Sequence, residues 1–309
     1  MLNCPLPTRN HRAVPKFSCT PSGGLAKPGL GALKKTPGRP KFSCTPSGGL
    51  AKPGMGACMT GSRKWLETAL AQHGLRLRGG WVPGPGDATL PPLAAAAVAV
   101  VWMVGQVGSE CWPAFSGSAF LHDGLPDPLD RWSKSIGDAL ARQCAGRAIY
   151  PSDGPPFAPF QQWARRAEPL QTSPLLLQIH PQFGLWHAYR FALALPQLDA
   201  DDAGTIVTQQ QQPQTDVCLS CVSQPCLSAC PVDAFTTSGY AVDRCAGHLQ
   251  GPAGSDCVVS GCRARRACPV GVGYAYAQPH AAFHMAAFAT RHGDSVTPQT
   301  PQKREPRLP

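Results

Sequence analysis

The sequence lacks an apolar run long enough to cross a bilayer. Its longest run, Leu93–Val104, is much shorter than the roughly 20 residues that a membrane-spanning helix needs. The basic residues near the N-terminus are not followed by the apolar stretch of a secretory signal. Motifs for a phosphate-binding loop, a dinucleotide-binding loop or a Ser–His–Asp triad are also missing. We therefore expect a cytoplasmic protein with no membrane partner.

Acidic residues are missing from residues 1–58, and this explains most of the formal net charge of +10. Of the 28 Lys and Arg residues, nine lie in this segment, which leaves 19 against the 18 acidic residues of 59–309. The rest of the chain is therefore almost neutral. A nucleic-acid surface would need a basic excess in the folded part, so we expect no nucleic-acid partner.

The basic leader, 1–58, contains a duplicated segment. PKFSCTPSGGLAKPGLGA at 15–32 recurs at 40–57 with one difference, Leu30 against Met55. The copies have no hydrophobic periodicity with which to stack into a repeat core, and their composition is typical of disorder. One interpretation is a flexible tail that binds an anionic partner. The other, which we favour, is a wrongly assigned start codon upstream of Met59.

Hydrophobic periodicity predicts a mixed α and β domain over residues 59–198. The predicted helices are 63–73, a segment from Asp127-Pro128 to Gly146, and a short one that follows a Pro-rich loop within 151–169. The predicted strands are 95–104, 175–180 and 185–195. A polar linker, 199–216, then leads to a cysteine-rich domain, 217–291, whose last helix is 275–291, and to a disordered tail, 292–309. The predicted fold class is α+β.

Eight of the 14 cysteines lie in the second domain, in two groups. The groups read Cys-x2-Cys-x4-Cys-x3-Cys-Pro and Cys-x11-Cys-x4-Cys-x5-Cys-Pro. Their members are Cys218, Cys221, Cys226, Cys230, Cys245, Cys257, Cys262 and Cys268. Cysteine density without an export signal favours metal binding over disulfides. Closely spaced cysteines supply three thiolates of a cubane cluster, and a fourth comes from elsewhere, so the chain has enough ligands for two [4Fe–4S] clusters.

Two Cys4 zinc sites are the competing interpretation of the same eight residues. Zinc ribbons usually pair two short Cys-x2-Cys units, and the second group contains none. We therefore favour iron–sulfur clusters. The isolated Cys111 and Cys144 are expected to be buried apolar residues and not ligands.

Charged and histidine residues near the cysteines have two interpretations each. The arginines of the last loop, Arg263, Arg265 and Arg266, either offset cluster charge and dock an acidic redox partner or form a solvated turn. His280 and His284 stand four apart, which suits a metal pair, but packing of an Ala-rich helix explains them more simply.

The cysteine groups resemble those of bacterial two-cluster ferredoxins. Both end in Cys-Pro, and CPVDAF after the first looks like the usual ferredoxin continuation. In those ferredoxins the cysteine before proline ligates the other cluster. The resemblance implies that one cluster is held by Cys218, Cys221, Cys226 and Cys268. It implies that the other is held by Cys245, Cys257, Cys262 and Cys230.

The order of cysteines, four, one and three, also resembles epoxyqueuosine reductase and the short ferredoxin-type proteins related to it. VDRCAGHL (242–249), VAVVWMV (98–104), YPSDGPP (150–156) and HPQFGLWHAYRFALALP (180–196) carry the resemblance. In the reductase the upstream domain binds cobalamin, and an acidic residue in a loop protonates the substrate. Asp153 is the one position that suits that role here, although an Asp before Pro155-Pro156 is equally suited to closing a turn, which we favour.

The sequence thus predicts an electron-transfer protein that carries two [4Fe–4S] clusters and works with a redox partner protein or a small electron donor. One alternative is a cobalamin-dependent reductase in which Asp153 donates a proton. Another is a redox-sensing protein whose clusters control binding to a partner.

Overall fold

The computed structural model describes residues 63–84, 86–87, 90–210, 216–236 and 239–293. The predicted leader, 1–58, and residues 294–309 of the predicted tail lie outside the described residues. All of the described residues belong to one compact unit of the chain. Among the described residues, no helix combines the length and the apolar character that spanning a bilayer requires.

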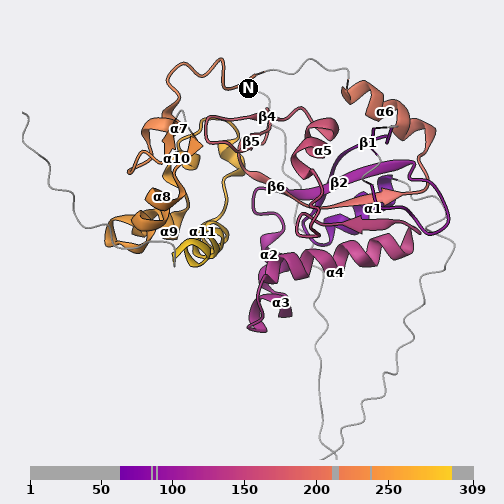
Figure 1. Ribbon diagram of the computed structural model, residues 1–309, viewed down its shortest axis with the longest axis horizontal. Helices are drawn as coiled ribbons and strands as arrows, with labels where there is room; N and C mark the ends of the chain where they lie inside the picture. Colours follow the sequence, from indigo (N-terminus) through magenta and orange to yellow (C-terminus); the bar gives the residue numbers. More distant parts are fainter. Residues whose placement is uncertain (1–62, 85, 88–89, 211–215, 237–238, 294–309) are drawn as a thin grey trace, which may run out of the picture. The chain divides into compact units, whose positions relative to one another are not determined.

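The first half of this unit is built on a four-stranded antiparallel sheet with the order β1-β2-β6-β3 (Figure 1). The strands are β1 (Arg76–Trp81), β2 (Val100–Val107), β3 (Arg147–Ile149) and β6 (His187–Leu195). Every residue of β2 is buried, as expected for a central strand covered on both faces. An antiparallel sheet with helices packed on it confirms the α+β class.

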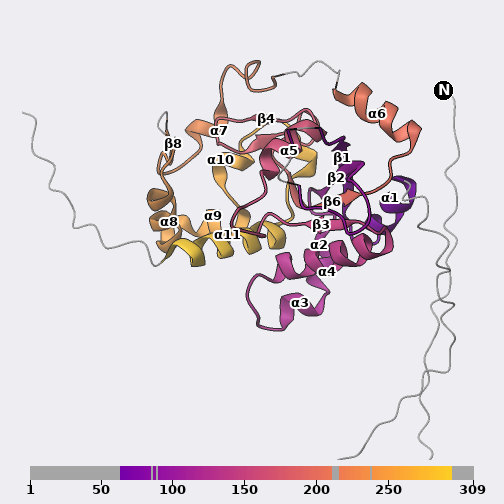
Figure 2. The same cartoon turned by 45° about the vertical axis from the view of Figure 1, so that its right-hand side comes forward.

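Helices cover the two faces of the sheet, with α4 on one side and α5 on the other (Figures 1 and 2). The helices of this half are α1 (Arg63–Ala71), α2 (Trp112–Ser116), α3 (Ala119–His122), α4 (Pro128–Gln143) and α5 (Phe160–Ala167). The helix α4 begins at a proline, and Leu129, Trp132, Ile136 and Leu140 form its buried stripe. Phe191 and Leu193 meet that stripe, whereas Ala192 and Ala194 pack against α5 and its neighbours.

A β-bulge interrupts the pairing of β2 with β6. Val104 pairs with Phe191 and Gly105 pairs with Tyr189, so Arg190 has no Cα partner on β2. As a result Tyr189 packs with the core on the α5 face, although Phe191 belongs to the α4 face. Gly105 is required here, because a Cβ would collide with the carbonyl oxygen of Ala188.

The remaining elements are short helices and two small hairpins, and both hairpins and several of the helices contribute to a third apolar cluster. The helices are α6 (Ala200–Gln210), α7 (Pro225–Ser228), α8 (Val242–Gln250), α9 (Ser255–Ser260), α10 (Arg263–Arg266) and α11 (Gln278–Gly293), with 3-10 turns at Pro252–Gly254 and Val272–Tyr274. The hairpins pair β4 (Gln171–Thr172) with β5 (Gln178–Ile179) and β7 (Phe235–Thr236) with β8 (Gly239–Tyr240).

The predicted elements and the observed ones differ at several boundaries. The central strand begins at Val100 and not at residue 95, since an alanine run has low strand propensity. Only Gln178–Ile179 of the predicted strand 175–180 is paired. Residues 200–210, predicted as linker, form α6, because Ile206 is buried in the apolar cluster that also includes Leu66 and Leu70 of α1. The strands β1 and β3 were not predicted, because RLRGGW and RAI carry no clear alternation.

Candidate metal centre

The eight predicted ligands lie on turns and short helices, where a chain can present several side chains toward one point. Cys226 lies in α7, Cys245 in α8 and Cys257 in α9, whereas Cys262 lies just before α10. Most of these cysteines lie in or against one apolar cluster, which includes Leu175, Ile179, Leu185, Ala234 and Ala264. The cysteines concerned are Cys218, Cys226, Cys230, Cys245, Cys262 and Cys268. Cysteines that are far apart in the sequence therefore lie close together in the fold.

One set of thiols consists of Cys218, Cys221, Cys226 and Cys268. Burial raises the pKa of Cys218 to about 11, and negative charge on Asp216 and on the other three thiols acts in the same direction. Burial likewise raises the pKa of Cys226, and charge on Cys268 and Cys221 adds to it. Mutual repulsion of this kind requires proximity, so Cys268 lies near the three early cysteines although more than 40 residues separate them.

The other set consists of Cys230, Cys245, Cys257 and Cys262. Burial raises the pKa of Cys245, the Tyr240 hydroxyl lowers it, and charge on the other three thiols raises it. Burial also raises the pKa of Cys262, and charge on Cys257 and Cys230 adds to that rise. Cys230 thus lies near the later cysteines, although it follows the first group in the sequence.

Backbone N–H groups are directed at several of the sulfur atoms. The amide of Ala234 donates to Cys230 Sγ at 3.3 Å. Hydrogen bonds from the backbone at Arg265 and Ala264 lower the pKa of Cys262 against the dominant effect of burial. The backbone at Val270 does the same for Cys268. Such donors stabilise thiolate charge and, in iron–sulfur proteins, tune the reduction potential.

Within the residues that the structure describes, no three His, Cys, Asp or Glu side chains are grouped closely enough to hold one metal ion.

The three arginines of the last cysteine loop have different partners. Arg263 and Arg266 both pair with Asp256 on α9, in contacts that are partly exposed. Arg265 donates to the carbonyl oxygen of Leu185 and lies over the rings of Trp186 and Tyr276, with its guanidinium carbon 4.6 and 4.4 Å from the ring centroids. Arg265 therefore ties the cysteine loop to the start of β6, which a solvated turn would not do.

Glycines allow the same two segments to meet backbone to backbone. Gly184 has a φ of 58°, and a Cβ there would collide with the carbonyl of Val270. Gly271 has a φ of 70°, and a Cβ there would collide with Phe183. The segment after Cys268 is thereby held against the turn that precedes β6.

His280 and His284 contact each other and residues of the sheet. Their Nε2 atoms lie 3.1 Å apart, and His280 also contacts Gln106 Nε2 at 3.2 Å and Ser109 Oγ at 3.0 Å. His280 is almost fully buried, so its role as a packed, hydrogen-bonded side chain agrees with the simpler interpretation. Cys111 and Cys144 are both buried in the core on the α4 face, as predicted.

Asp153 lies in an exposed loop after β3. Its carboxylate accepts a hydrogen bond from the backbone N–H of Tyr150 at 3.1 Å, and its own N–H donates to the Tyr150 carbonyl at 3.1 Å. These contacts close a turn, which is the role that we favoured for this residue.

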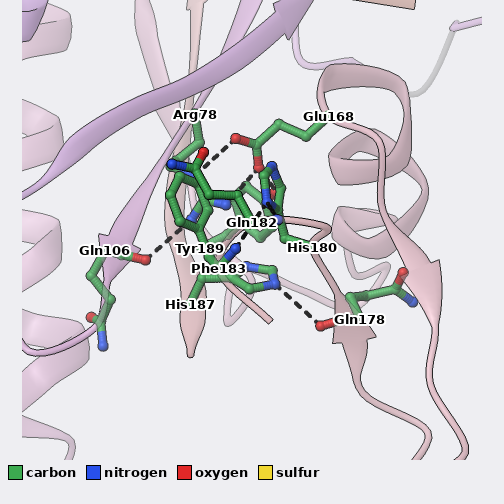
Figure 3. A network of polar contacts seen from close by, with 9 residues as sticks. All are labelled: Arg78, Gln106, Glu168, Gln178, His180, Gln182, Phe183, His187 and Tyr189. Atoms are coloured by element: carbon green, nitrogen blue, oxygen red, sulfur yellow. Dashed lines mark hydrogen bonds and ion pairs between the residues drawn. The ribbon is translucent and has the colours of Figure 1, made fainter. Parts of the chain in front are cut away.

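A buried polar network, which the sequence did not reveal, joins residues of β1, β2 and β6 to Glu168 and to the segment between β5 and β6 (Figure 3). Arg78 on β1 donates to Glu168 through Nε at 2.9 Å and Nη2 at 2.7 Å, and to the Gln106 carbonyl at 3.1 Å. The Tyr189 hydroxyl donates to the same carboxylate. Burial raises the pKa of Glu168, and the Arg78 guanidinium opposes that rise. The one sequence signal was the presence of three polar residues, His187, Tyr189 and Arg190, at the start of an otherwise apolar strand.

Two histidines complete the network and are held in the neutral form. His187 Nε2 lies 3.2 Å from the Gln178 carbonyl oxygen, and His180 Nδ1 accepts from the backbone N–H of Gln182 at 3.0 Å. Burial lowers the pKa of His187 to about 3, with further lowering by the charges of Arg78, His180 and Arg265. Burial and Arg78 lower the pKa of His180 to about 4.

The lowered pKa of His187 predicts an acid-sensitive stability. Below pH 6.5 the unfolded chain binds a proton at this residue that the folded chain does not, so the free energy of unfolding falls as the pH falls. Between pH 6.5 and pH 5, one such histidine lowers the free energy of unfolding by about 2 kcal/mol. We expect the free energy of unfolding of the variant H187Q to fall by about 2 kcal/mol less than that of the wild type as the pH is lowered. Urea unfolding at pH 7, 6 and 5 measures this difference. Parallel curves for variant and wild type would contradict the prediction.

Comparison with known proteins adds no relative: no protein-family model matches the chain, and no curated protein matches its sequence.

Proposed function

We propose that this protein transfers single electrons through two [4Fe–4S] clusters. The observation that carries the proposal is the division of eight thiols into two sets of four, each drawn from both cysteine groups. Cys230 and Cys268, which each precede a proline, lie with cysteines of the opposite group, and the corresponding cysteines of two-cluster ferredoxins ligate the other cluster. Two zinc sites would not require Cys230 and Cys268 to lie with the opposite cysteine groups.

The residues around the thiols suit a redox cluster. When bound, each cluster supplies a site that gains and loses one electron. The chain contributes thiolate ligands, apolar burial and backbone N–H donors to sulfur, which together set the reduction potential. Arg265 lies between Cys262 and Cys268 in the sequence, and its guanidinium is held by the Leu185 carbonyl oxygen. A positive charge close to a cluster would favour the reduced, more negative state of that cluster.

The electron-transfer function is favoured over the reductase alternative. Asp153, the proton donor that the reductase would need, uses its carboxylate to close its own turn. A cobalamin-binding test separates the two functions, because added cobalamin would acquire a protein-bound corrinoid spectrum only in the reductase.

The proposal predicts the metal content of the protein. Protein purified without oxygen should contain about eight iron and eight acid-labile sulfide per chain, with no stoichiometric zinc, and should give coupled S = 1/2 EPR signals after reduction. These quantities are measured by elemental analysis, sulfide assay and EPR. About two zinc per chain, without sulfide, would replace the proposal with a zinc-stabilised interaction module.

A further inference from the structure

A pocket of about 420 Å3 opens beside strand β6 and has no part in holding the thiols. It is lined by β6, by the segment around Gln178, by α10 and by the last helix. The polar residues on its wall that matter here are His187, Arg190, Arg265 and His284. A pocket of this size suits a small molecule and not a polymer.

The pocket exists because β6 is paired unequally on its two sides. The strand β3 pairs only with Ala192–Ala194, so in the described part of the chain no strand covers that edge over 187–190. An open edge presents unpaired backbone N–H and C=O groups. The bulge at Arg190 also changes the direction of the side chains, a common use of bulges beside binding sites.

The pocket is positively charged. It contains two guanidinium groups, from Arg190 and Arg265, and the residues that the structure assigns to its lining include no Asp or Glu. The carboxylate nearest to Arg190 is that of Asp130, at 4.0 Å from Nη1. Glu168, behind the pocket, is already paired with Arg78. An anionic ligand is therefore expected.

Two buried polar atoms on the wall indicate what else the ligand carries. Arg190 Nε and His187 Nδ1 are both buried without a hydrogen-bond partner. His187 Nε2 faces a carbonyl oxygen and must donate to it, so Nδ1 of the neutral ring is an acceptor. The ligand should therefore bring an acceptor to Arg190 and a donor to His187. Leu177 and Leu185 form apolar wall between these polar groups.

We propose that this pocket binds a small hydroxy-carboxylate with an apolar body. The carboxylate lies against the Arg190 and Arg265 guanidinium groups, the hydroxyl donates to His187, and the body contacts the leucines. The proposed ligand does not depend on the presence of the clusters. Because Arg265 belongs to the loop between Cys262 and Cys268, a ligand bound to it would lie next to that loop.

The test uses 4-hydroxybenzoate as the probe, with isothermal titration calorimetry on the full chain purified without oxygen. We expect one site per chain. The neutral analogue 4-hydroxybenzamide should bind about tenfold more weakly or worse, because it lacks the charge-assisted hydrogen bonds. The variant R190Q should lose affinity for the acid by a similar factor, whereas R142Q, an equal charge change on the exposed face of α4, should retain it.

Three results would overturn the proposal. They are equal affinity for the acid and the amide, unchanged affinity in R190Q, and sulfate binding as tightly as the acid, which would indicate a site for any anion. Because the acid, amide and sulfate are compared on the wild-type chain, the test remains decisive even if R190Q fails to fold. The metal content of the same sample is measured separately. A lack of clusters, which would contradict the proposed function, is therefore distinguishable from a lack of binding in this pocket.

Discussion

Two double variants that each remove two cysteines should differ by about four iron per chain. C226A/C268A removes two thiols from one set, so about four iron per chain should remain in the other. C226A/C230A removes one thiol from each set, although the two residues are only four apart in the sequence, and should hold almost no iron. Iron and sulfide are counted after anaerobic reconstitution, and EPR of C226A/C268A should show one uncoupled S = 1/2 centre.

The matched control is C111A/C144A. These cysteines are equally buried but lie in the core on the α4 face, so the full complement of iron should remain. Circular dichroism of each variant checks that the helices are retained. If C226A/C230A keeps more iron than C226A/C268A, the thiols are grouped as they occur in the sequence and the interlocked arrangement is wrong.

The variant R78M should destabilise the protein by about 3–5 kcal/mol, the cost of leaving a buried carboxylate without its partner. Arg78 is 2 % exposed and Glu168 12 %, and the guanidinium also lies over the rings of Phe183 and Tyr189, at 5.0 and 5.1 Å from their centroids. Methionine keeps much of the volume but none of the charge or the hydrogen bonds. Urea unfolding followed by circular dichroism measures the difference.

The control for this variant is R63M. Arg63 and Glu67 form an ion pair one helical turn apart, with side chains 32 % and 44 % exposed, so its loss should cost no more than about 0.5 kcal/mol. The double variant R78M/E168L should recover much of the lost stability, since both charges are then removed together. A cost below 1 kcal/mol for R78M would show that Glu168 finds another partner or takes up a proton.

The local elements followed from sequence patterns wherever one face of an element is uniformly apolar. The stripe Leu129, Trp132, Ile136 and Leu140 predicted α4 almost to its ends, because helical periodicity survives any tertiary context. The apolar runs likewise predicted the two central strands. Short elements such as β1 and β3 escaped prediction, since their positions depend on the strands they pair with and not on their own residues.

The sequence alone determined that eight thiols, in two groups that each end in Cys-Pro, are available for metal binding. It carried no physical information on which thiols come together, and only the ferredoxin resemblance implied the exchange of Cys230 and Cys268. The tertiary structure decided those neighbourhoods, along with the contact between Arg78 and Glu168, which are 90 residues apart. A pattern along the chain reports on local geometry, whereas electrostatic and hydrogen-bond partners are chosen by the packing that brings distant segments together.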